Sequence, residues 1–118
     1  MPKGIDLETI KPLMKDESDE IAAYAGYFAV LLGESSGMEP LLKFWRKNED
    51  AESLSVLVYR AIGSLDDSQY IPILREIYEK LDEYEVRDFY WHIRRMTGSA
   101  ILPFRKEIRD KHGMDVLQ

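Results

Sequence analysis

Apolar residues between positions 51 and 81 recur twice at the spacing of an amphipathic helix, with a short polar interruption between the two runs. The first run carries Leu54, Leu57, Val58, Ala61, Ile62 and Leu65, and the second carries Ile71, Leu74, Tyr78 and Leu81. This spacing follows the 3.6-residue period of an α-helix. The interruption, Asp66-Asp67-Ser68, offers N-cap side chains for the second helix. Because the connection is so short, we predict an antiparallel helical hairpin.

The same period predicts further helices on both sides of this hairpin. The expected ranges are 7–15, 20–32, 38–47, 84–96 and 100–111, beside 69–81 within the hairpin. The 20–32 segment is apolar on nearly every side, which is typical of a buried helix. One expected face is Ile21, Tyr24, Ala25, Phe28, Leu31 and Leu32, and the other is Ala23, Tyr27 and Val30. We therefore predict an all-α chain of about seven helices, with this one buried between its neighbours.

Prolines and glycines recur along the chain at a nearly constant interval. The prolines beside large apolar residues are Pro12, Pro40, Pro72 and Pro103, spaced by 28, 32 and 31 residues. A glycine precedes each of the last three, at Gly33, Gly63 and Gly98, and Ile21, Ala51 and Val86 each stand 12 residues before one of these glycines. A period of about 30 residues with two helices per unit predicts an α-solenoid, or α-α superhelix. We expect about three and a half antiparallel hairpins.

These hairpins are expected to form one domain over residues 1–118. It would comprise a leading half-repeat at 5–15 and repeats at about 16–47, 48–81 and 82–112. A chain that starts on half a repeat is either capped by that helix or part of a longer array. The sequence leaves both alternatives open.

Three short motifs give the repeats a family resemblance. Glu85-Val86-Arg87 stands where the first helix of a repeat begins, and Met96-Thr97-Gly98 stands where that helix ends. Ile71-Pro72-Ile73-Leu74 stands where the second helix of the preceding repeat begins. They resemble HEAT-like repeats, especially the short phycobilisome-lyase-type repeat. Ala22 and Glu52 stand where that pattern has Arg. The resemblance implies a binding scaffold; it carries over no lyase activity, because a repeat type is not a site.

Composition narrows the class of protein. The chain is 45% apolar and 32% charged, which indicates a globular protein rather than a disordered one. It has no cysteine, so disulfides, thiolate metal sites and a cysteine nucleophile are excluded. No apolar run approaches the roughly 18–20 residues that span a bilayer, and we see no signal peptide. We therefore expect a cytoplasmic protein without membrane contact.

Charge is distributed unevenly along the chain. The net charge of −6 argues against a general nucleic-acid binder. Residues 61–86 carry seven acidic and two basic side chains, net −5, whereas residues 87–112 carry seven basic and three acidic ones, net +4. Adjacent helices of opposite charge can simply complement each other. The alternative is a basic docking patch at 87–112, which is the support for a nucleic-acid-binding helical-repeat protein.

No set of residues points to a reaction. Asp88 and His92 lie four apart on one helix, yet two potential metal ligands without a third are weak evidence for a metal site. Asp66 and Asp67 are expected as helix caps rather than as a catalytic carboxylate pair. Ser35-Ser36 has no nearby histidine to act as its base. We expect no enzyme, no cofactor and no metal.

The sixth helix carries the best candidate for binding. Arg87, Trp91 and Arg94 or Arg95 follow at helical spacing away from the apolar stripe. An exposed Trp among arginines is typical of binding hot spots, although cation–π packing within the helix gives the same pattern. Phe44, Arg75 and Tyr78 are further candidates, on the other helix layer. We predict a non-catalytic scaffold that binds another protein, or else a terminal module of a larger repeat assembly.

Overall fold

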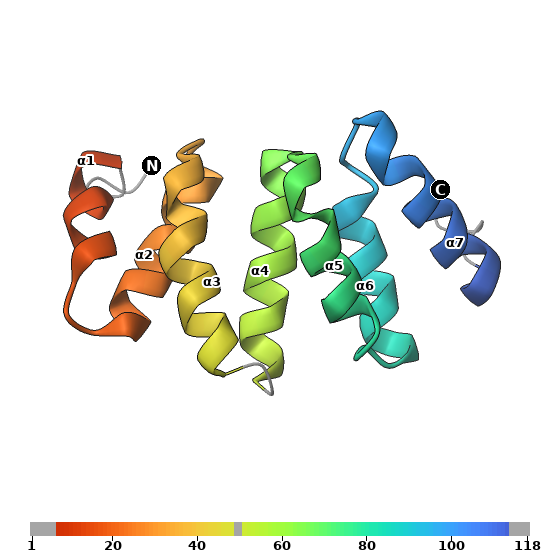
Figure 1. Ribbon diagram of the computed structural model, residues 1–118, viewed down its shortest axis with the longest axis horizontal. Coiled ribbons are helices and arrows are strands. Elements are labelled where there is room, and N and C mark those ends of the chain that lie inside the picture. Colours follow the sequence, from red (N-terminus) through yellow and green to blue (C-terminus); the bar gives the residue numbers. More distant parts are fainter. Residues whose placement is uncertain (1–6, 49–50, 114–118) are drawn as a thin grey trace. The chain divides into compact units, whose positions relative to one another are not determined.

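The computed structural model describes residues 7–48 and 51–113, and every element within these ranges is helical (Figure 1). The α-helices are α1 (Leu7–Ile10), α2 (Asp19–Leu31), α3 (Met38–Lys47), α4 (Glu52–Leu65), α5 (Ile71–Tyr78), α6 (Glu83–Ile93) and α7 (Leu102–His112). The 3-10 turns are η1 (Lys11–Lys15), η2 (Ser35–Gly37), η3 (Ser68–Tyr70) and η4 (Ser99–Ile101). The predicted all-α class is confirmed. Within the described ranges, no helix combines the length and apolar character that crossing a membrane requires.

The chain divides into two compact units, and the division falls inside α4. The first unit ends at Ala61 and the second begins at Ile62. The division does not coincide with a boundary of the predicted repeats, so each unit is described by itself. The predicted half-repeat starts at position 5, which lies outside the described ranges. The repeat predicted to start at position 48 includes residues 49–50, which also lie outside them.

One local structure recurs three times. A three-residue 3-10 turn that begins with serine precedes α3, α5 and α7, and these serines, Ser35, Ser68 and Ser99, are 33 and 31 residues apart. Each following helix carries a proline within its first three residues. Proline is tolerated there because the first N–H groups of a helix have no intrahelical acceptor. The periodic prolines of the sequence therefore mark helix starts.

The second unit has the core that its apolar period predicts, on the expected face of α6. The side chains Val86, Phe89, Tyr90, Ile93 and Met96 are all buried. The Phe89 ring stacks on Tyr78 of α5 with centroids 6.0 Å apart and meets Phe104 of α7 edge-on at 6.1 Å. Such aromatic pairs stabilise a core beyond the area they bury. The aromatic cluster holds α6 against both α5 and α7.

Helix α2 in the first unit differs from its prediction. Its buried side is made of small residues: Ala22, Ala23, Ala25, Gly26, Ala29 and Val30. The expected large core residues are exposed: Ile21, Tyr24, Phe28, Leu31 and Leu32. The prediction that α2 is buried all round is therefore wrong. The helix packs through its small residues and presents its large ones to solvent.

Two close contacts explain this orientation of α2. A Cβ atom placed on Gly26 would clash with the carbonyl oxygen of Gly37 and lie 2.9 Å from Pro40, so the α2 backbone touches the start of α3 directly. On an adjoining side, Ile10 packs against Ala25 and Ala29. Side chains as large as Phe or Leu do not fit in gaps of this size. The small side of α2 is thus the one that both neighbours accept.

Gly26→Ala tests this close approach. The added methyl group would force α2 away from the backbone at Gly37, and overpacking of this kind costs about 1–3 kcal/mol of unfolding free energy. Urea unfolding followed by circular dichroism measures the loss. Gly98→Ala is the matched control, because nothing lies within 4 Å of its added Cβ. Equal stability of Gly26→Ala and wild type would contradict the described packing.

Candidate functional site

The outer face of α6 carries an exposed aromatic pair. Trp91 is 50% exposed, and Tyr84 is 87% exposed. The two residues are seven positions apart, so they lie on the same side of the helix with a rise of about 10 Å between them. The guanidinium carbon of Arg94 lies 4.3 Å from the centroid of the Trp91 ring. This geometry is a cation–π contact, and it leaves half of the indole open to solvent.

Two more arginines border this aromatic pair. Arg87 is exposed one helical turn before Trp91, and Arg95 is exposed in the turn that follows the helix. Arg94 and Arg95 also stand at the C-terminal end of α6, where the helix dipole favours cations. We call Tyr84, Arg87, Trp91, Arg94 and Arg95 the α6 face. It combines a flat apolar centre with a cationic border.

The other predicted binding residues have different surroundings. Tyr78 is buried, its hydroxyl lies 2.9 Å from Nε2 of His112, and burial raises the pKa of its phenol. It therefore offers no surface to a partner, which corrects its assignment as a candidate. Arg75 is exposed but forms two hydrogen bonds to the Glu107 carboxylate, at 3.0 and 2.9 Å. Phe44 is half-buried on α3 in the first unit.

Most cations of the basic 87–112 segment contact groups of the same unit. Arg94 lies over the Trp91 ring. Arg105 donates a hydrogen bond to the Met96 carbonyl, and Arg109 donates one to the Tyr90 hydroxyl at 3.3 Å. Lys106 forms an ion pair with Asp110 at 2.7 Å, and the Lys111 amine lies 5.7 Å from the Tyr78 ring centroid. The segment is therefore largely engaged in intramolecular contacts. None of these five contacts pairs a cation with an acidic side chain of residues 61–86, so the complementary-charge alternative stays a prediction.

A turn residue links the two helix connections of the second unit. Asp66 has a φ of +55°, in the left-handed region that Asp tolerates better than most residues. Its carboxylate accepts hydrogen bonds from the Thr97 N–H, at 3.0 and 2.9 Å, and from the Thr97 hydroxyl at 2.6 Å. The Thr97 hydroxyl and amide together lower the pKa of Asp66. Asp67 instead caps η3 through the Gln69 N–H, so only Asp67 has the predicted capping role.

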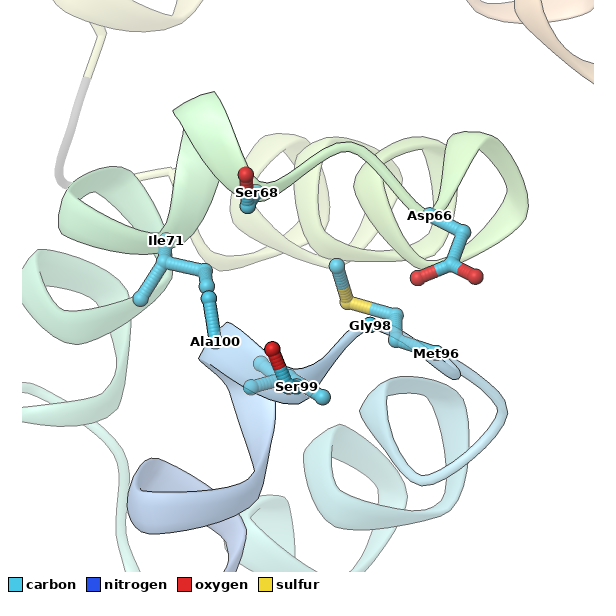
Figure 2. Close-up of a pocket in the computed structure, with 8 residues that line it drawn as sticks. Asp66, Ser68, Ile71, Met96, Gly98, Ser99 and Ala100 are labelled. Carbon is cyan, nitrogen blue, oxygen red and sulfur yellow. The ribbon is translucent and has the colours of Figure 1, made fainter.

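A shallow pocket of about 250 Å³ lies beside this link (Figure 2). Asp66, Ser68, Ile71, Met96, Gly98, Ser99, Ala100 and Ile101 line it. In Figure 2 the Asp66 carboxylate is directed toward the chain at Met96 and Gly98. That carboxylate already accepts the Thr97 donors, and the lining holds no histidine, lysine or arginine. The pocket therefore offers no acid–base pair for catalysis.

Asp88 and His92 are the pair of potential metal ligands that the sequence singles out. Asp88 and His92 approach to 3.8 Å on α6, and they form an ion pair only when the imidazole is protonated. Across residues 7–48 and 51–113, no cluster of three or more potential ligands is placed to hold a metal ion.

Sequence reasoning missed two features of this unit. Tyr84 was expected only as the start of the sixth helix, whereas α6 begins one residue earlier and leaves Tyr84 almost fully exposed. Asp82 and Glu85 form the capping box that fixes this start, and the Asp-x-x-Glu spacing could have indicated it. The partner of Asp66 is 31 residues away, so no local pattern predicts it.

No family model, no curated protein and no solved structure matches the chain.

Asp66→Asn tests the link between the two connections. Asparagine tolerates the left-handed backbone but lacks the charge. A hydrogen bond to a charged group contributes about 1.5–3 kcal/mol, against about 0.5–1.5 kcal/mol for a neutral one. We expect a loss of about 1 kcal/mol at neutral pH. Because the folded-state pKa of Asp66 is lowered, its stabilisation is present above the unfolded-state pKa and disappears as the pH falls through the folded-state pKa.

The measurement is thermal unfolding of both proteins over a series of acidic and neutral pH values. The difference between wild type and Asp66→Asn should shrink toward zero at low pH. Asp110→Asn is the control, because it removes an exposed i, i+4 ion pair that contributes only about 0.3–0.5 kcal/mol. Equal losses for the two variants at neutral pH would show that the Thr97 contacts carry no special weight.

Proposed function

We propose that this chain is a non-catalytic scaffold of HEAT-like repeats that binds another protein through the α6 face. The observation that carries the proposal is the half-exposed Trp91 under Arg94, with Tyr84 two turns away. A large aromatic side chain in water gains free energy when a partner covers it, because apolar burial contributes about 25 cal/mol per Å². Trp, Tyr and Arg are the residue types most enriched among binding hot spots.

The repeat part of the proposal is supported by contacts separated by about one period. In the second unit, Asp66 contacts Thr97 and Arg75 contacts Glu107, over 31 and 32 residues. In the first unit, Asp19 forms an ion pair with Lys47, 28 residues away, at 2.8 Å. Together with the periodic serine-initiated turns, these contacts are what stacked hairpins of about 30 residues would make. A cytoplasmic location also stays a prediction of the sequence.

The chemistry of the α6 face suggests the kind of segment that it binds. The indole and phenol rings suit an apolar or aromatic side chain, and Arg87 and Arg95 suit carboxylates beside it. Arg94 is already held over the indole, so less side-chain entropy is lost when a partner binds. We therefore favour an acidic peptide segment with an aromatic or aliphatic anchor. A nucleic-acid partner is less favoured, because most cations of the 87–112 segment already contact protein groups.

Trp91→Ala is the decisive variant for this function. Peptides selected from a random library on the immobilised wild-type chain serve as probes, and fluorescence polarisation gives their dissociation constants. Removing the indole should weaken their binding by about tenfold or more, the effect of losing a hot-spot side chain. The helical circular dichroism should not change, because half of the side chain is already in solvent.

Leu102→Ala is the matched control, because Leu102 on α7 is also 50% exposed. The dissociation constants of Leu102→Ala for the selected peptides should equal those of the wild-type chain. If both variants bind all selected peptides as tightly as wild type, the α6 face is not the binding surface. Loss of the helical signal in Trp91→Ala would instead assign Trp91 a structural role.

A further inference from the structure

Helix α2 presents a continuous apolar stripe to solvent. Its members are Ile21, Tyr24, Phe28, Leu31 and Leu32, each between 39% and 48% exposed. We call them the α2 stripe. Their spacing places them on one side of the helix, opposite the small residues that pack in the first unit. The stripe is about 16 Å long, because a helix rises about 1.5 Å per residue.

The predicted repeats align the α2 stripe with residues that are buried in the last repeat. Gly33 and Gly98 hold corresponding positions in the predicted repeats and are 65 residues apart, so each stripe position has a counterpart in the last repeat. The counterparts of Ile21, Tyr24, Phe28 and Leu31 are Val86, Phe89, Ile93 and Met96. All four counterparts are buried, and Phe89 contacts Tyr78 of α5 and Phe104 of α7; the fifth stripe residue, Leu32, corresponds to the exposed Thr97. The stripe therefore has the residue types of a covered face, but the described residues leave it open.

The size of the stripe is sufficient to form the centre of an interface. At these exposed fractions, five side chains of roughly 200 Å² each leave about 400–500 Å² of apolar surface in water. A standard protein interface takes about 800 Å² from each partner, and its rim is polar. The stripe supplies the apolar centre, and the polar groups on its two edges supply the rim.

Charged side chains of both signs border the stripe. Around the helix, Glu20 lies next to Leu31 and Tyr24 on one edge. The other edge is bordered by η1, whose exposed Lys15 is followed directly by the exposed Asp16 and Glu17. The rim of the stripe is therefore polar and mixed in charge, as the rim of a standard interface is.

We propose that the α2 stripe is the interface of a homodimer in which the two stripes pack against each other about a two-fold axis. A second copy supplies an apolar helix face of matching length, with Phe28 near its centre. Two such faces together remove about 800–1,000 Å² of apolar surface from water, which with a polar rim reaches the size of a standard interface. The dimer is closed, because an interface across a two-fold axis uses the same patch on both subunits.

The first test is sedimentation equilibrium of the full chain from low micromolar to several hundred micromolar. The expected result is a reversible equilibrium between the 13.8 kDa monomer and a dimer. Phe28→Glu should weaken dimerisation by at least tenfold, because it places a carboxylate at the centre of the apolar contact. Leu102→Glu, on an equally exposed apolar residue of α7, should dimerise like wild type.

Circular dichroism establishes that each variant is folded, and Leu31→Glu repeats the test if Phe28→Glu loses helicity. A wild-type chain that stays monomeric over the whole range overturns the proposal, and so does a dimer that Phe28→Glu and Leu31→Glu leave intact. A concentration-dependent series of species larger than the dimer also overturns it, because such a series indicates open stacking of chains rather than a closed dimer. The α6 face is untouched by Phe28→Glu and Leu31→Glu, so the result for the dimer is independent of the proposed peptide binding.

Discussion

The direct backbone contact between α2 and the start of α3 determines what the first unit shows to solvent. Gly26 and Gly37 approach so closely that neither position has room for a side chain. A helix held this near its neighbour packs through its smallest residues, and here these are alanines and one glycine. The large apolar residues of the same helix then face outward. The exposed stripe is thus a geometric consequence of the glycine contact.

The second unit follows a different packing rule. Helix α6 turns most of its large apolar residues inward, where Phe89 meets the rings of Tyr78 and Phe104, and Tyr84 and Trp91 are its exposed aromatic residues. Gly63 of α4 again allows a close approach, this time to the His92 backbone, because an added Cβ would lie 2.7 Å from the His92 oxygen. Small residues therefore set helix separations in both units, whereas the large residues are buried in α6 and exposed in α2.

The sequence predicts the helices and the core of the second unit because both depend on local spacing. Leu74, Phe89 and Ile93 lie on a single apolar stripe of their helices, so the buried side is unambiguous. Helix α2 is apolar on two sides, and periodicity cannot say which side a neighbour will accept. The alanines and Gly26 indicate close approach, yet the contact with Gly37 belongs to tertiary structure. For the same reason the Asp66–Thr97 link was beyond a local prediction.

The orientation of α2 is the central claim, and cysteine reactivity tests it most directly because the chain has no cysteine of its own. Phe28→Cys and Ala29→Cys place thiols on neighbouring residues, of which the structure exposes the first and buries the second. At a concentration where the chain is monomeric, the thiol at position 28 should react with a maleimide nearly as fast as a free peptide thiol. The thiol at position 29 should react only through opening of the fold, slower by orders of magnitude. Equal rates, or faster reaction at position 29, would contradict the account.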